Sequence, residues 1–159
     1  MRGKQWLVLI GFIALSEGAG TLGSLFTIPS IAGWYATLAR PQLAPPNWVF
    51  GPVWTTLFLL MGIAAFLVWC SGGDRKDVRI GLGIFLLQLV LNVLWSVIFF
   101  GYHNLGGACI EIVFLWFAII ATIAAFARIS NSAALLLLPY LAWVSYAAYL
   151  TYTFWSLAT

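Results

Sequence analysis

Three polar side chains recur every four residues in the apolar stretch QLVLNVLWS, at Gln88, Asn92 and Ser96. An α-helix would place all three on one face, because residues four apart lie above one another. Amides and hydroxyls inside a membrane segment either hydrogen-bond to a neighbouring helix or line a site. Interhelical bonding is the simpler interpretation of this stripe, and ligand recognition is the alternative.

Two carboxylates lie within apolar segments, Glu17 and Glu111. A charge in hydrocarbon is costly, so Glu17 either serves a proton- or cation-linked pathway or is held neutral or hydrogen-bonded in packed protein. Glu111 is closer to the end of its segment, where we expect interfacial water to solvate it. Around Glu17, small residues recur every four positions at Ser16, Gly20 and Ser24, a pattern that predicts close helix packing.

Residues with catalytic or metal-binding chemistry are sparse. Cys70 and Cys109 show no CxxC or Cys/His spacing and are expected to be packing residues. His103, the single histidine, is expected to be an exposed turn residue, with haem ligation as the alternative. We therefore predict no metal site, no nucleophilic triad and no carboxylate pair. Any redox chemistry would depend on tryptophan indoles acting with a bound photosensitiser.

The elements that must position these residues are membrane-spanning helices. Of the 159 residues 64% are hydrophobic and 7% are charged, which excludes an ordinary soluble domain. The apolar runs do not alternate with polar residues as barrel strands would. We predict an all-α membrane protein, with residues 1–159 forming a single five-transmembrane-helix bundle. The expected spans are 6–27, 48–70, 78–102, 105–127 and 133–157, and each is long enough to cross the hydrocarbon core.

Charge predicts the orientation. With five spans, one side of the membrane carries six of the seven basic residues, and the other side carries Arg40. The six are Arg2, Lys4, Arg75, Lys76, Arg79 and Arg128. The positive-inside rule then places the N-terminus in the cytoplasm and the C-terminus outside. A cleaved signal peptide is the alternative for the first run, although its apolar character continues through Phe26. No basic cluster suggests nucleic acid.

Proline shapes the segment WYATLARPQLAPPNWVFGPVW, which joins the first two spans. Residues 28–47 are predicted to form a stiff aromatic lid loop. Pro45 and Pro46 suit the first turn of the second helix, where a missing N–H costs nothing. Pro52 and Pro139 should bend the second and fifth helices by freeing the carbonyls four residues earlier. Two bent helices would leave a cavity between them.

Aromatic side chains follow these bends. The spacing places Trp54 and Phe58 on one face of the second helix, and Trp143 and Tyr146 on one face of the fifth. An interfacial aromatic belt is the alternative. A cavity walled by such rings suits a flat, mostly apolar ligand such as a tetrapyrrole or a sterol, because dispersion and stacking scale with ring area.

Three blocks, WYATLARPQLAPPNWVFGPVWTTLF, QLVLNVLWSVIFF and PYLAWVSYAAYL, resemble the signatures of the TspO family of tryptophan-rich sensory proteins, related to the translocator protein. The resemblance implies a five-helix bundle, usually a homodimer, that binds porphyrins in a pocket closed by the first loop. It implies functional use of the Asn92 stripe and assigns the pocket to Tyr35, Pro45, Trp54, Phe58, Asn92, Trp95, Trp143, Tyr146 and Ala147. Trp54 and Trp143 match the tryptophans implicated in light-dependent porphyrin breakdown, which makes them candidate catalytic residues.

Several positions depart from the family pattern. Arg40 replaces a common lysine, Leu43 replaces an aromatic residue, and Thr151 stands where an asparagine is frequent. No basic residue follows Tyr152, so the cholesterol-recognition pattern is absent, and sterol binding through it is not expected.

The predicted function is a membrane receptor, sensor or transporter for tetrapyrroles such as porphyrin or haem. No obligatory cofactor is expected. One alternative is a light- and oxygen-dependent porphyrin-degrading enzyme, and another is a small proton-linked transporter that uses Glu17.

Overall fold

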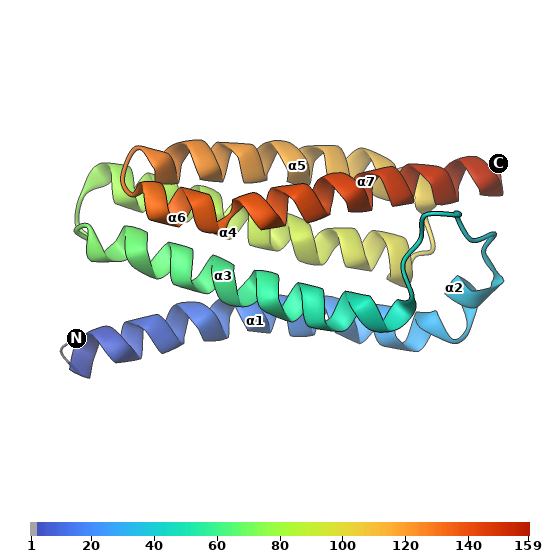
Figure 1. Ribbon diagram of the computed structural model, residues 1–159, viewed down its shortest axis with the longest axis horizontal. Helices are drawn as coiled ribbons and strands as arrows, with labels where there is room; N and C mark the ends of the chain where they lie inside the picture. The colour runs from blue at the N-terminus through green and yellow to red at the C-terminus, as the bar shows by residue number, and fades with distance from the viewer. Residues whose placement is uncertain (1–2) are drawn as a thin grey trace.

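The computed structural model describes residues 3–159, which fold into helices joined by turns (Figure 1). Arg2, counted above among the basic residues, lies outside this range. The elements are α1 (Gly3–Ile31), α2 (Trp34–Thr37), the 3-10 helix η1 (Asn47–Val49), α3 (Phe50–Cys70), α4 (Lys76–Ser96), the π-helix η2 (Val97–Gly101), α5 (Leu105–Ala127), α6 (Asn131–Leu136) and α7 (Leu138–Ala158).

The described part of the chain contains five stretches of helix long and apolar enough to cross a membrane. They are Gly3–Ile31, Asn47–Cys70, Lys76–Gly101, Leu105–Ala127 and Asn131–Ala158. The predicted all-α membrane fold with five spans is thereby confirmed. Lipid explains why the fold is helical: each helix satisfies its own backbone hydrogen bonds where the surroundings offer none.

The first connection is shorter than the predicted loop 28–47. Helix α1 continues through Pro29 to Ile31, and α2 adds a further turn of helix after it. The helix therefore runs four residues beyond the predicted end of the first span at residue 27. Ser30 helps to hold the last turn of α1, because its hydroxyl donates to the Phe100 carbonyl oxygen of η2 at 2.8 Å.

The prolines act at the beginnings of helices. Pro46 is the cap residue directly before η1, so the Pro45–Pro46 pair precedes the second span and does not lie in its first helical turn as predicted. Pro52 is the third residue of α3, so it occupies the first turn and not the interior in which we predicted a bend. In the fifth span the helix is interrupted at Leu137, and Pro139 lies in the first turn of the new helix α7.

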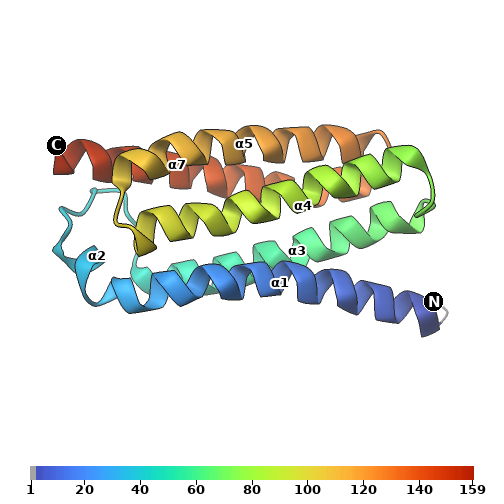
Figure 2. The ribbon, with the colours of Figure 1, turned by 180° about the vertical axis from the view of Figure 1, so that it is seen from behind.

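The helices run lengthwise beside one another (Figures 1 and 2). Helix α1 packs against α3 and α4, α5 packs against α4, α6 and α7, and α6 packs against α3. The N-terminus and the α3–α4 turn lie at one end of the bundle, and α2 and the C-terminus lie at the other (Figure 1). We call the first end the packed half, because side chains there are fully buried, including Met61, Ala64, Ala65, Val68 and Val78.

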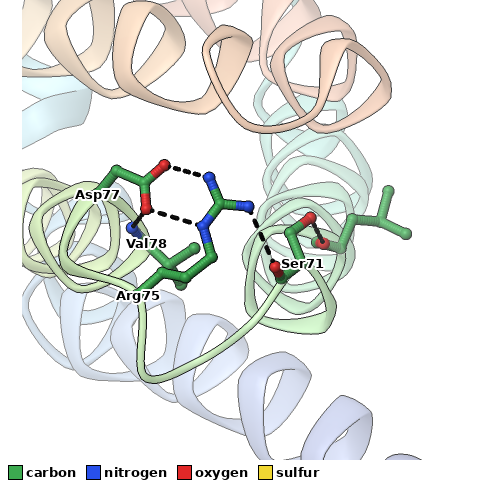
Figure 3. A network of polar contacts seen from close by, with 5 residues as sticks. Ser71, Arg75, Asp77 and Val78 are labelled. Carbon is green, nitrogen blue, oxygen red and sulfur yellow. Dashed lines mark hydrogen bonds and ion pairs between the residues drawn. The ribbon is translucent and has the colours of Figure 1, made fainter.

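The α3–α4 turn is fixed by one arginine (Figure 3). Arg75 donates from Nε and Nη2 to the two carboxylate oxygens of Asp77, and from Nη1 to the Ser71 carbonyl oxygen. The backbone N–H of Val78 donates to the same carboxylate at 3.0 Å. Gly72 adopts φ +122°, a conformation that favours glycine.

Candidate ligand-binding cavity

A cavity of about 460 Å³ occupies the other half of the bundle, between α1, α3, α4 with η2, and α7. Its volume lies within the range of roughly 300–1,000 Å³ typical of small-molecule sites. The lining positions on α1 extend from Glu17 to Ile31 and those on α4 and η2 from Asn92 to Phe100. We call the end at Glu17 and Asn92 the inner end, and the end near α2 the loop end.

Aromatic rings form much of the wall. Trp54 stacks on Phe58 with ring centroids 5.6 Å apart, and Trp95 stacks on Phe99 at 5.0 Å. Trp143 on α7 is also part of the wall. These rings come from three helices and leave open space between them. The predicted aromatic cavity is thus present, although Pro52 and Pro139 lie in the first turns of α3 and α7 and not in helix interiors.

Most of the predicted site residues line this cavity, namely Tyr35, Trp54, Phe58, Asn92, Trp95, Trp143 and Ala147. Pro45 and Tyr146 do not. The Pro45 carbonyl oxygen accepts a hydrogen bond from Arg40 Nη2, and the Tyr146 hydroxyl donates to the Leu43 carbonyl oxygen. Both residues therefore hold the connection between α1 and α3 in place.

The polar stripe on α4 is part of a buried hydrogen-bond network. Asn92 Nδ2 donates to the Tyr140 hydroxyl at 2.8 Å, and that hydroxyl donates to Gln88 Oε1 at 2.7 Å. Gln88 Nε2 then contacts Met61 Sδ at 3.6 Å. Gln88 thus makes interhelical contacts and does not line the cavity. Asn92 makes an interhelical hydrogen bond and also lines the cavity. Sequence reasoning missed Tyr140, although it lies one helical turn before Trp143.

The α1 wall was also missed as part of the site. Gly20, Gly23, Ser24 and Thr27 line the cavity on the stripe that the sequence assigned to packing, and Glu17 beside them lines it too. The small residues of this stripe also allow α1 to pack closely against its neighbours. A Cβ on Gly20 would lie 2.6 Å from the Phe58 ring, and one on Gly23 would lie 3.0 Å from a side-chain oxygen of α4. The recurrence of small and polar residues every four positions was the signal for both roles.

The two intramembrane carboxylates lie in different surroundings. Glu17 is half-buried and lines the cavity. Glu111 is 6% exposed, and neither of its carboxylate oxygens has a hydrogen-bond partner within residues 3–159. The expectation that water solvates Glu111 is wrong, because its face of α5 packs against the neighbouring helices.

The connection between α1 and α3 is ordered at its start by an aromatic stack. Trp34 stacks on His103 with centroids 4.2 Å apart and an interplanar angle of 14°. His103 is exposed, as expected, and adopts φ +53° in the α4–α5 turn. Burial raises the pKa of the Tyr35 phenol above its usual value, and the charge of Arg40 opposes that shift. Tyr35 therefore stays neutral at physiological pH.

Side chains that could bind a metal ion are sparse among the described residues. Within residues 3–159 no cluster of three or more His, Cys, Asp or Glu side chains could hold a metal ion. The cavity wall offers rings, hydroxyls, amides and one carboxylate. Such a wall binds by stacking, dispersion and hydrogen bonding.

Five spanning helices, four of which line an aromatic cavity, define a multi-pass integral membrane protein. The chain belongs to the TspO/MBR family, whose sequence pattern it matches over residues 12–156. It is 46% identical to the tryptophan-rich protein TspO of Chlorobaculum tepidum, over 94% of this chain and 95% of that protein. It is 36% identical to the translocator protein of Bos taurus, over 94% and 89%, and 36% identical to protein CrtK of Rhodobacter capsulatus, over 87% and 85%. The family resemblance noted in the sequence is confirmed.

Proposed function

We propose that this protein is a membrane receptor or sensor that binds a flat, largely apolar ligand of the tetrapyrrole class in the cavity. The observation that carries the proposal is the open space between Trp54, Trp95 and Trp143, each on a different helix. Membership of a family that includes tryptophan-rich sensory and translocator proteins supports the receptor or sensor role.

The physical basis is the size and rigidity of the aromatic wall. A large planar ring loses little conformational entropy on binding and gains dispersion and stacking over its whole area. Asn92 supplies a polar group beside the rings. This combination of extensive apolar surface with a few polar groups is typical of small-molecule sites.

The test is a tryptophan-fluorescence quenching titration of the purified protein with protoporphyrin IX in the dark. We expect saturable quenching at micromolar ligand, weakened by Trp54→Phe and by Trp143→Phe. Trp6→Phe is the matched control, because Trp6 is 52% exposed near the N-terminal end of α1 and does not line the cavity. Linear quenching shared by all four proteins would indicate partitioning into the micelle and would refute the proposal.

Light-dependent breakdown of the ligand is a second candidate function, since both candidate indoles, Trp54 and Trp143, line the same cavity. Illumination of the bound porphyrin with oxygen should then give a defined product, and either Phe variant should abolish it. Bleaching at the rate of free porphyrin would exclude the enzyme.

We also propose a cytoplasmic N-terminus and a homodimer. The described basic residues support the orientation, since Arg75, Lys76, Arg79 and Arg128 lie at the same end of the bundle as Lys4. Thiol labelling of Cys70 from either side of sealed vesicles tests it, because Cys70 is exposed at the cytoplasmic end of this topology. Cross-linking in native membranes tests the dimer.

A further inference from the structure

The hydroxyl groups along the α1 wall of the cavity use their protons within α1. Thr21 Oγ1 donates to the Glu17 carbonyl oxygen at 2.9 Å, Ser24 Oγ donates to that of Thr21 at 2.7 Å, and Thr27 Oγ1 donates to that of Gly23 at 3.1 Å. A hydroxyl has one proton and two lone pairs. Toward a ligand these three side chains are therefore hydrogen-bond acceptors.

The threonines on the other walls behave in the same way. Thr55 Oγ1 on α3 donates to the Gly51 carbonyl oxygen at 3.0 Å. Thr151 Oγ1 on α7 donates to the Ala147 carbonyl oxygen at 2.7 Å. Both threonines line the cavity, so acceptors face it from three helices.

The amide of Asn92 adds another acceptor, because the buried network fixes its orientation. The hydroxyl of Tyr140 donates its one proton to Gln88 and must accept from Asn92 Nδ2. Asn92 Oδ1 is left without a hydrogen bond within residues 3–159, although Asn92 is only 7% exposed and lines the cavity. An unpaired carbonyl oxygen in such a place favours a ligand that can donate to it.

Donors are scarcer at the inner end. The indole Nε1 atoms of Trp95 and Trp143 are covered by protein, so their N–H groups are not accessible to a ligand in the cavity. Ser96 lies in the contact between α1 and α4, where its Oγ would be 3.0 Å from a Cβ on Gly23. The N–H of Trp54, the third lining indole at this end, is not among the buried N–H groups without a partner.

Glu17 supplies the formal charge of the cavity. It is the acid among the lining residues, and no lysine or arginine of the described chain lines the same space. Its carboxylate forms no hydrogen bond or ion pair within residues 3–159. Arg40 lies beyond the loop end, where it borders a smaller hollow with Tyr35 and Asn47.

We propose that the inner end of the cavity selects the donor or cationic end of a flat apolar ligand, a protonated amine above all, through Glu17 and Asn92. An anionic group of the same ligand would point to the loop end, toward Arg40. This proposal rests on the proposed function, because it assumes that the cavity binds flat apolar molecules. It adds a charge preference that the aromatic wall alone would not impose.

Three probes with the same ring test the preference: pyrene-1-methylammonium, pyrene-1-methanol and pyrene-1-carboxylate. Binding is followed by energy transfer from tryptophan to pyrene in a non-ionic detergent at pH 7.4. In a partly desolvated site the Glu17 carboxylate attracts the ammonium probe and repels the carboxylate probe. We expect the ammonium probe to bind on the order of tenfold more tightly than the carboxylate probe, with the alcohol in between.

Glu17→Gln should reduce the difference in affinity between the ammonium probe and the carboxylate probe to less than about twofold. Asp74→Asn is the matched control, because it makes the same change of acid to amide at an exposed residue of the α3–α4 turn and should preserve the preference. The comparison of the three probes uses the wild-type protein, so it does not depend on whether a variant folds.

The outcomes separate the two proposals. Saturable binding of all three probes with equal affinity, or a preference that survives Glu17→Gln, overturns the charge preference and leaves the aromatic site standing. A preference lost in Asp74→Asn also overturns it, because general charge attraction would then explain the result. If no probe gives saturable binding, the proposed function fails and this inference fails with it.

Discussion

The packed half and the cavity half of the bundle are built from the same long helices, yet one is filled with side chains and the other is open. In the packed half Met61, Ala64 and Val68 are completely buried. In the cavity half η1 precedes α3 and η2 follows α4, and the rings of Trp54, Trp95 and Trp143 line open space. The difference shows that one set of helices can pack closely at one end of a bundle and enclose space at the other.

The boundary between the halves is the network of Gln88, Tyr140 and Asn92. Tyr140 is 1% exposed and Gln88 is 1% exposed, whereas Asn92 already faces the cavity. Three substitutions, one on each side and one at the boundary, separate stability from ligand binding.

The largest loss of stability is expected for Gly62→Ala in the packed half. A Cβ there would lie 2.7 Å from Ile13 Cα and 3.0 Å from the Phe12 carbonyl oxygen, and these backbone atoms of α1 cannot turn aside. We expect the free energy of unfolding to fall by about 3 kcal/mol, measured by thermal or denaturant unfolding in detergent. Gly83→Ala, where a Cβ meets nothing within 4 Å, is the control and should be neutral or slightly stabilising.

An intermediate loss is expected for Tyr140→Phe at the boundary. Removal of the hydroxyl leaves Gln88 Oε1 and Asn92 Nδ2 without their partner in a buried place, at a cost of about 1–3 kcal/mol. Ligand affinity should fall as well, because the Asn92 amide is then free to reorient. Tyr149→Phe changes a 47% exposed tyrosine on the same helix and should alter neither stability nor binding. Equal stability of the two variants would contradict the role assigned to the network.

The smallest loss of stability is expected for Gly20→Ala in the cavity half. The added Cβ would lie 2.6 Å from the Phe58 ring, but this ring borders open space and can turn into it. We expect a cost of about 1 kcal/mol or less, together with a several-fold loss of porphyrin affinity because the ring now occupies part of the cavity. A loss of stability as large as that of Gly62→Ala would show that the two halves do not differ in this way.

The sequence predicted the fold class well because each span is a long apolar run, a signal that depends on no tertiary contact. Five of the ten aromatic lining residues were also predicted, and the ring spacing on α3 and α7 pointed to Trp54, Phe58 and Trp143 among them. The bounds of 105–127 for the fourth span agree with α5. The end of α1 was missed, because the Ser30 bond to η2 that holds the last turn comes from a distant segment.

Other features depended on contacts between helices that no local pattern contains. The sequence shows that Gly20 and Gly23 are small, and in the structure they both allow close packing and form part of the α1 wall. The burial of Glu111 depends on how the neighbouring helices cover α5. Nothing in the residues around Val97 predicts that the helix changes there to the wider π form.

The connection between α1 and α3 has a kinetic consequence. Its start is held by the stack of Trp34 on His103, and its later part by the bonds from Arg40 and Tyr146. A loop held in place by such contacts adds little ordering cost to ligand binding. These same contacts must break before a ligand can enter or leave the cavity past the loop. Such a ligand should therefore bind and dissociate slowly, while its affinity is little affected. Residence time and affinity can therefore be tuned by different residues.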